Sequence, residues 1–282
     1  MIPLMRVLGF KEVHNMFQVA AIQMTPIMND VDGNIKRGVH LAKNAIAEEA
    51  DLIVFPELWT TGYHLSRESF RALAEKPDGK TVSTFQEIAK QGEVSIVCPF
   101  VEEAGDKIYI AAAVIDTEGE TRGIVRKSLL WGREQQIFNA GVMEYPTFDS
   151  KVGKIGILIC YEMEFPETSR LLALEGAEVI VCPSVWSMSA AHRWEIQLPA
   201  RALDNTVFVL GVNTVGNNSC GKSKLLSPMG DVLAEASGRK EEILIRAIDK
   251  EALLWARDEV SYLEDYKTKL TPGGEEIPTP IW

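Results

Sequence analysis

Short and nearly unbroken apolar runs recur along the chain, each long enough for one strand and rich in β-branched residues. They cover residues 19–22, 52–55, 95–98, 155–160, 179–182 and 207–210. None alternates with polar positions, so both faces of each strand should be covered. Amphipathic helical patterns lie between several of these runs, at 34–49, 83–91, 166–175 and 191–205. The pattern predicts an α/β protein whose strands are buried on both sides.

Two stretches of the chain resemble each other. Residues 50–59 (ADLIVFPELW) align without gaps on residues 177–186 (AEVIVCPSVW). Each stretch follows a helical pattern, and each helical pattern follows an apolar run. The two halves could therefore be related βαβ units whose sheets stack face to face under outer helices. Chance similarity of two βα units is the alternative.

Composition agrees with a large folded chain. The 282 residues are 46% hydrophobic and 24% charged, with ordinary glycine and proline counts. These values exclude a disordered chain, a collagen-like repeat and a disulfide-stapled mini-protein. No linker-like stretch divides the middle. We therefore expect a single domain over residues 1–270, followed by an extended proline-rich tail over residues 271–282 that ends on Ile281-Trp282.

Charge and sequence signals narrow the class of partner and the compartment. The 40 acidic residues exceed the 29 basic ones, giving a formal net charge of −11, which argues against a nucleic-acid partner because such proteins neutralise phosphates with clustered Lys and Arg. No uncharged stretch approaches the ~20 residues of a membrane span, and no cleavage site follows the apolar residues 2–10. We expect a cytoplasmic protein that does not enter the membrane.

The four cysteines form no short-spaced pair, so neither a disulfide framework nor a zinc ribbon is predicted. They are Cys98, Cys160, Cys182 and Cys220. Cys98 and Cys182 sit inside apolar runs and are interpreted as buried thiols. Cys160 instead ends an apolar run just before a predicted helix, where a thiol can be presented to a site. Taken alone, Cys160 also fits a buried structural thiol.

Two further charged groups follow predicted strands. Glu57 comes after the run 52–55, and Lys127 follows a predicted strand at 123–126, with Glu134 seven residues further on. Each could be an ordinary loop charge. Together with Cys160 they supply the parts for acyl transfer: a thiolate that attacks, a carboxylate that takes and returns protons, and an ammonium that stabilises the anionic intermediate.

The sequence here resembles the nitrilase superfamily of carbon–nitrogen hydrolases, from about Phe17 to the 260s. Four local motifs carry the resemblance, in order and at the right separations. They are Pro56-Glu57-Leu58 with Gly62-Tyr63, Arg126-Lys127, Glu134 with Phe138 and Gly141, and Cys160-Tyr161-Glu162 with Phe165-Pro166-Glu167. One departure is Ser128, which follows Lys127 where many relatives carry histidine.

The resemblance implies a four-layer α-β-β-α sandwich with two stacked mixed sheets and internal pseudo-two-fold character. It also implies that Glu57 is the general base for Cys160, that Lys127 and the backbone N–H of Tyr161 form the oxyanion hole, and that Glu134 positions Lys127. We expect the two carboxylates to keep Lys127 charged, and its charge to favour the Cys160 thiolate. Aromatic side chains beside the motifs could line a pocket or pack in the core; they are Tyr63, Trp131, Tyr161 and Trp186.

The reaction class follows from the same resemblance. Cys-Tyr-Glu at 160–162 looks more like the amidase and carbamoylase branches than like true nitrilases. We expect a cysteine-dependent amidase that hydrolyses a small linear carboxamide to acid and ammonia through a Cys160 thioester, with no cofactor and no metal. N-carbamoyl amine or amino acid hydrolysis ranks second and nitrile hydrolysis third. The resemblance further suggests a homodimer, or a higher homo-oligomer, that the tail helps to hold.

Two competing interpretations of other residues remain. Residues 216–223 (GNNSCGKS) fit the phosphate-binding expression G-x-x-x-x-G-K-S, but no helix pattern follows, so a nucleotide site is not expected. A cysteine–histidine hydrolase is the second alternative, because His64 and His192 lie near motifs and Arg193 could bind a substrate carboxylate. A non-catalytic binding module is a third possibility, although all four catalytic positions are filled.

Overall fold

The computed structural model describes residues 16–270. One six-stranded sheet has the strand order β14 (Glu242–Asp249), β1 (Met16–Gln23), β2 (Leu52–Val54), β3 (Ser95–Ala104), β4 (Lys107–Ile115) and β5 (Thr121–Arg126). The other has the order β13 (Val232–Glu235), β12 (Lys224–Leu226), β9 (Phe208–Asn213), β8 (Val179–Ser184), β7 (Gly153–Ile157) and β6 (Thr147–Ser150). A short hairpin joins β10 (Val215–Gly216) and β11 (Ser219–Cys220).

The two large sheets share one topology. In the first, the central strands β1, β2 and β3 run parallel, and β14 and β4 flank them antiparallel. In the second, β7, β8 and β9 run parallel, and β6 and β12 flank them antiparallel. The aligned stretches 50–59 and 177–186 supply the equivalent strands β2 and β8. This agreement supports the predicted relation between the two halves.

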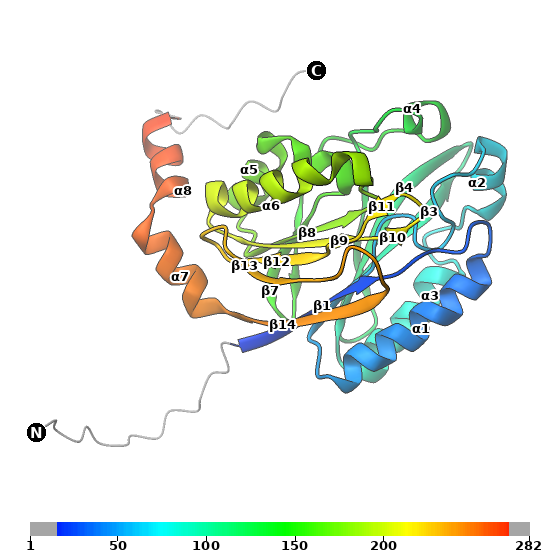
Figure 1. Ribbon diagram of the computed structural model, residues 1–282, viewed down its shortest axis with the longest axis horizontal. Helices are drawn as coiled ribbons and strands as arrows, with labels where there is room; N and C mark the ends of the chain where they lie inside the picture. The colour runs from blue at the N-terminus through cyan, green and yellow to red at the C-terminus, as the bar shows by residue number, and fades with distance from the viewer. Residues whose placement is uncertain (1–15, 271–282) are drawn as a thin grey trace, which may run out of the picture.

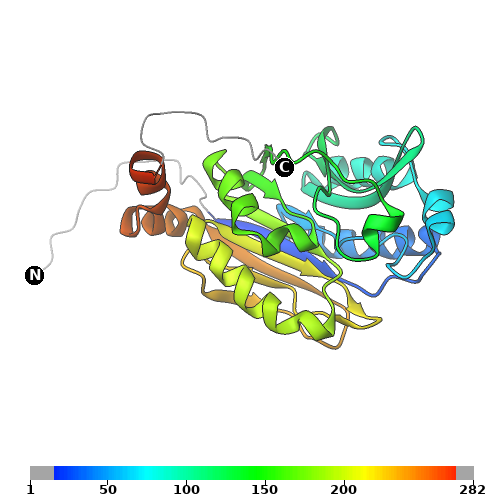
Figure 2. The same ribbon diagram turned by 90° about the horizontal axis from the view of Figure 1, so that it is seen from above.

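Helices cover the outer face of each sheet (Figures 1 and 2). On one side lie α1 (Val31–Ala47) and α3 (Lys80–Gly92), and on the other lie α5 (Pro166–Leu174) and α6 (Ala191–Asn205). The shorter α2 (Arg67–Leu73) and α4 (Glu134–Ile137) lie near one end of the molecule, whereas α7 (Lys250–Glu259) and α8 (Tyr262–Asp265) lie at the other. The predicted four-layer α-β-β-α sandwich is confirmed.

Three hydrophobic layers hold the four layers of structure together, because successive strand side chains point to opposite faces. Val54 and Val181 belong to the layer between the two sheets. Their neighbours Ile53 and Ile180 instead pack under the outer helices, in two separate clusters. This alternation explains why the strands carry apolar residues at every position.

Several boundaries differ from the sequence prediction. The strand predicted to end at Cys160 ends three residues earlier, at Ile157, and Cys160 begins a 3₁₀ turn that extends to Glu164. Helices α7 and α8 and strand β6 carry weaker patterns and were not predicted. No helix within residues 16–270 is long and apolar enough to cross a membrane. The stretch 2–10, His14 and the tail 271–282 lie outside the described residues, so the boundary at residue 270 stays a prediction.

Candidate active site

Three charged side chains meet in the interior at the ends of strands. Glu57 follows β2, Lys127 directly follows β5, and Glu134 begins α4. The Lys127 ammonium lies 2.7 Å from Glu57 Oε1 and 2.8 Å from Glu134 Oε2. Lys127 and Glu57 are fully buried, and Glu134 is nearly so. Residues 70 positions apart in the sequence therefore lie in one cluster.

Backbone and side-chain donors fix both carboxylates. The second oxygen of Glu57 accepts a hydrogen bond from the backbone N–H of Val185 at 3.0 Å. Glu134 accepts one from the backbone N–H of Trp131 at 2.8 Å and one from the Tyr63 hydroxyl at 3.2 Å. Val185 follows β8 just as Leu58 follows β2, so the equivalent ends of the two βαβ halves meet at this point.

Cys160 lies at a tight change of chain direction. Its φ is +53°, in the left-handed region that non-glycine residues rarely adopt. Backbone strain of this kind persists only where the surrounding structure holds it, and it clusters at active sites. The 3₁₀ turn that starts at Cys160 leads into α5 at Pro166. The predicted turn from strand to helix at the thiol is thus present, three residues beyond the end of β7.

A small cavity of about 120 Å³ opens beside Cys160. The four aromatic residues expected near the motifs all line it; they are Tyr63, Trp131, Tyr161 and Trp186. The rings of Trp131 and Tyr161 lie 4.8 Å apart. Trp186 is almost fully buried, and its indole N–H donates to the Ala190 carbonyl. Of the two roles considered for these aromatic residues, pocket lining and core packing, Trp186 has both, because it packs in the core and also forms part of the cavity wall.

Burial and neighbouring charges have opposite effects on the pKa values of Glu57 and Lys127. Desolvation raises the pKa of Glu57 above its ordinary value, although Lys127 partly offsets this effect. Burial disfavours the charge of Lys127, but Glu57 and Glu134 outweigh that penalty and hold its pKa well above the ordinary range. The lysine is therefore a permanent cation beside a carboxylate with enhanced basicity.

The Cys160 thiol responds to the same groups. Burial raises its pKa well above the ordinary value, and Glu57 raises it further, whereas Lys127 lowers it. The expected effect of Lys127 on the thiolate is present, but desolvation and the carboxylates outweigh it. The Cys160 thiol therefore holds its proton more tightly than an ordinary cysteine does.

Sequence reasoning missed part of the cavity wall. Asn217 and Asn218, in the turn between β10 and β11, line the cavity, and both have positive φ. Arg193, which lines it as well, forms an ion pair of 3.1 Å with Glu164. Only the Asn-Asn pair, a turn signal, could have drawn attention to this segment. His64 lines the cavity, whereas His192 is exposed and does not.

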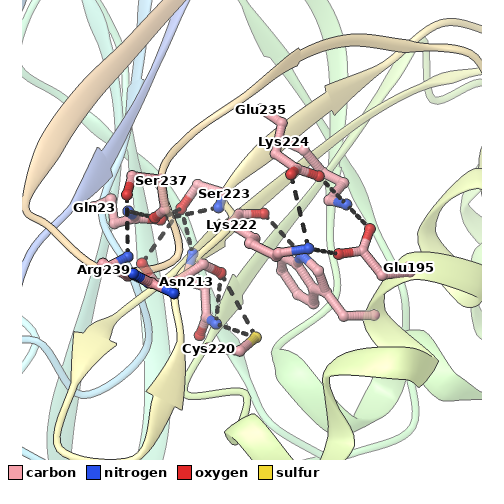
Figure 3. Close-up of polar contacts among 12 residues, drawn as sticks. Gln23, Glu195, Asn213, Cys220, Lys222, Ser223, Lys224, Glu235, Ser237 and Arg239 are labelled. Atoms are coloured by element: carbon pink, nitrogen blue, oxygen red, sulfur yellow. Dashed lines mark hydrogen bonds and ion pairs between the residues drawn. The ribbon is translucent and has the colours of Figure 1, made fainter.

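Residues 216–223 do not form a phosphate-binding loop in the structure. This stretch forms the hairpin β10–β11 and then enters β12, so no helix N-terminus faces an anion. The Lys222 ammonium pairs with Glu195 at 2.6 Å, and the backbone N–H and hydroxyl of Ser223 both donate to Gln23 (Figure 3). The donors that would bind phosphate are therefore committed to the protein itself.

The described part of the chain contains no candidate metal site. Across residues 16–270, no group of three or more His, Cys, Asp or Glu side chains is arranged to hold a metal ion. Cys98, Cys182 and Cys220 are buried free thiols. The buried cluster built on Lys127 brings a cation and a carboxylate of raised pKa within electrostatic range of the Cys160 thiol, which lines the cavity.

Comparisons with known proteins identify the family of the chain. A nitrilase from Pyrococcus abyssi is 37% identical over 240 residues, covering 83% of this chain and 90% of the relative. An (R)-stereoselective amidase from Pseudomonas sp. is 33% identical over 259 residues, covering 88% and 92%. The crystal structure of Saccharomyces cerevisiae Nit3, from the nitrilase superfamily, superposes with a TM-score of 0.79 at 27% identity, covering 87% and 94%. The carbon–nitrogen hydrolase family profile matches residues 18–257, so the chain belongs to the carbon–nitrogen hydrolase family.

Proposed function

We propose that this protein is a cysteine-dependent amidase that hydrolyses a small linear carboxamide to a carboxylic acid and ammonia. The observation that carries the proposal is the buried Glu57–Lys127–Glu134 cluster, whose charges act on the Cys160 thiol in the wall of a small cavity. An uncharged amide suits this cavity, because most of its wall is aromatic or apolar and because Arg193 and Glu164 neutralise each other. Amidases among the relatives support the same class of substrate.

In the first half-reaction, the Cys160 sulfur attacks the amide carbon while Glu57 takes the thiol proton. The carbonyl oxygen becomes an oxyanion, which the Lys127 ammonium and the backbone N–H of Tyr161 stabilise. Glu57 then returns the proton to the nitrogen, which leaves as ammonia. The raised pKa of Glu57 supports this role, because a stronger base removes a proton from a neutral thiol more readily.

In the second half-reaction, Glu57 takes a proton from water, and the resulting hydroxide attacks the Cys160 thioester. The C–S bond breaks, the carboxylic acid leaves, and the thiol regains its proton. Glu134 contributes by holding the Lys127 ammonium through a second ion pair of 2.8 Å. No step requires a metal or an organic cofactor, and activity should therefore survive a chelator.

An ammonia-release assay tests the proposal over three panels: small carboxamides, N-carbamoyl amines and amino acids, and nitriles. We expect turnover in the first panel and its complete loss in Cys160→Ala. Cys98→Ala is the control substitution, because Cys98 is a free thiol buried between the first sheet and helices α1 and α3 and does not line the cavity beside Cys160. Turnover that survives in Cys160→Ala would refute the mechanism.

The other two panels decide between the remaining activities. Release of ammonia from N-carbamoyl compounds alone would assign the second-ranked activity, and release from nitriles alone the third. Silence in all three panels would favour a non-catalytic binding module. Chelator treatment that abolishes activity, followed by recovery with zinc, would contradict a metal-free mechanism.

A further inference from the structure

One buried carboxylate beside the site is not used by the chemistry above. Glu162 is 1% exposed and lies in the first turn after Cys160. One of its oxygens accepts a hydrogen bond from the backbone N–H of Ile159 at 2.7 Å. The other accepts two from Ser128, from its backbone N–H at 2.8 Å and from its hydroxyl at 2.6 Å. Both oxygens of a buried carboxylate are thus fully engaged.

These partners are the immediate neighbours of two reacting groups. Ile159 directly precedes Cys160, and Ser128 directly follows Lys127. One rigid planar carboxylate therefore links the turn that carries the thiol to the segment that carries the ammonium, 34 residues apart in sequence. The left-handed φ of Cys160 is held from within the same turn by this side chain, because Glu162 reaches back to the residue before the thiol.

A third residue completes the connection. Tyr145 is buried, and its hydroxyl lies 3.0 Å from the Ser128 hydroxyl. Since Ser128 donates its own proton to Glu162, Tyr145 donates to Ser128. Burial and the Glu162 charge raise the pKa of Tyr145 to about 12, so the phenol keeps this proton at neutral pH. Donation in this network therefore converges on Glu162, from Tyr145 through Ser128 on one side and from the Ile159 N–H on the other.

We propose that Glu162 is a positioning residue that sets the relative placement of Lys127 and Cys160 through Ser128 and Ile159. The inference rests on the proposed function, since it concerns the same thiol and ammonium. Glu162 touches neither the substrate nor the reacting atoms. Its contribution is geometric: reacting groups misplaced by about 1 Å can lose about 100-fold in rate.

The test replaces Glu162 by Gln, which keeps the shape but turns one acceptor into a donor facing N–H groups. We expect kcat to fall about 100-fold, with KM little changed. We also expect slower alkylation of Cys160 by iodoacetamide, followed by mass spectrometry of the Cys160 peptide. Glu167→Gln is the matched control, because Glu167 is an exposed carboxylate five residues further along the same motif. Ser128→Ala removes the hydroxyl link to Glu162 and leaves the Tyr145 phenol without its acceptor, so we expect a lower melting temperature together with a kcat about tenfold lower.

Each outcome decides the proposal. A folded Glu162→Gln variant with the kcat and alkylation rate of the unmodified protein would overturn it, as would an equal loss in Glu167→Gln. If Glu162→Gln does not fold, Ser128→Ala decides, and an unchanged kcat and alkylation rate in that variant overturns it. Alkylation needs no substrate, so this measurement stands even if the unmodified protein hydrolyses none of the amides, a result that would refute the proposed function alone.

Discussion

At the scale of single residues, the site is dominated by the balance of charge around Lys127. Two carboxylates share one ammonium in a fully buried cluster, and removing these groups from water is costly. Glu57 bears that cost as a raised pKa, whereas Glu134 is held by two further hydrogen bonds from Trp131 and Tyr63. The proposed mechanism uses this difference, with Glu57 as the base and Glu134 as a support for Lys127.

The raised pKa of Glu57 predicts the acid limb of the pH profile. A general base must be unprotonated, so kcat/KM should fall as pH drops through the pKa of Glu57 in the folded protein. Because burial raises that pKa above 4.5, the limb should lie at a higher pH than for an ordinary glutamate. Steady-state rates on a substrate that does not titrate would show it. A profile that stays flat down to pH 4.5, with circular dichroism unchanged, would contradict the prediction.

Tyr63→Phe tests the support given to Glu134. The change removes one hydrogen bond of 3.2 Å and leaves the ring in the cavity wall. We expect kcat/KM to fall about fivefold, since one such bond contributes about 1 kcal/mol. Tyr262→Phe, on the exposed face of α8, serves as the control. Equal kinetics for both variants would show that Glu134 is held in place without the Tyr63 hydroxyl.

At the scale of elements, the motif E-x-x-x-F-x-x-G has a physical explanation in the segment after β5. Glu134 pairs with Lys127, and Phe138 packs against Phe70 of α2 with ring centroids 4.7 Å apart. The backbone N–H of Gly141 donates to the Lys127 carbonyl at 2.9 Å. The segment after Lys127 therefore contacts Lys127 twice, through the Glu134 side chain at the start of α4 and through the backbone N–H of Gly141.

Gly141→Ala should disturb this return. A Cβ at Gly141 would lie 2.4 Å from the Arg126 carbonyl oxygen, a backbone atom that cannot move without shifting Lys127. We expect a loss of about 1–3 kcal/mol in unfolding free energy together with a reduced kcat. Gly105→Ala separates the effects, because its φ of +64° imposes strain while nothing lies within 4 Å of the added atom. A Gly141→Ala enzyme with normal kcat would contradict the expectation.

A second buried lysine holds α6 against the sheet. Lys224 on β12 is fully buried and pairs with Glu195 of α6 and, at 2.6 Å, with Glu235 of β13 (Figure 3). Its neighbour Lys222 is 40% exposed at the side chain and also pairs with Glu195. The local sequence fits a nucleotide-binding motif, but in the structure these lysines form ion pairs that connect one helix to two strands.

Lys224→Met should therefore lower stability without affecting chemistry. We expect a loss of about 2–3 kcal/mol in chemical denaturation, less than for a wholly buried pair because both glutamates can turn towards water. Lys222→Met should cost less than about 1 kcal/mol, since solvent screens its ion pair. An equal loss of unfolding free energy in the two variants would contradict the structural role of the buried Lys224 ammonium. A lower kcat in a Lys224→Met variant that is fully folded would show that this ion-pair cluster also affects the active site.

At the scale of the whole molecule, we propose a homodimer. The apolar side chains of Leu254 and Trp255 on α7 are 65% and 56% exposed, and exposed apolar side chains of this size favour association. The chain also ends on the apolar pair Ile281-Trp282. The exposed side chains on α7 support the proposed dimer, whereas the contribution of the tail, which lies outside the described residues, stays a prediction.

Truncation after Leu270 tests this assembly. We expect the full chain to elute from gel filtration as a dimer and the truncated chain to elute at half the apparent mass. Circular dichroism of the truncated chain controls for loss of fold. Identical elution of the two chains would show that the tail does not hold the dimer, and a monomeric full chain would refute the dimer itself.

Much of this architecture was predictable because it depends on local periodicity. The apolar runs located β1, β2, β3, β7, β8 and β9, and the helical patterns located α1, α3, α5 and α6 to within a few residues. Strand β6 and helix α8 escaped because they are short and lack buried faces of their own. The end of β7 was misplaced because Leu158 and Ile159 are as apolar as the strand that precedes them.

The sequence by itself determined which residue types follow the strands, and hence the family and the four positions Glu57, Lys127, Glu134 and Cys160. Only the tertiary structure decided how these groups behave, because pKa values depend on burial and on charges brought together from distant segments. It placed the Val185 N–H against Glu57, raised the pKa of Cys160 despite Lys127, and set Glu162 between the segments that carry Lys127 and Cys160. The local sequence pattern predicts where strands and helices end. The electrostatic and hydrogen-bonding environment of a side chain depends instead on which of these ends lie together in the folded protein.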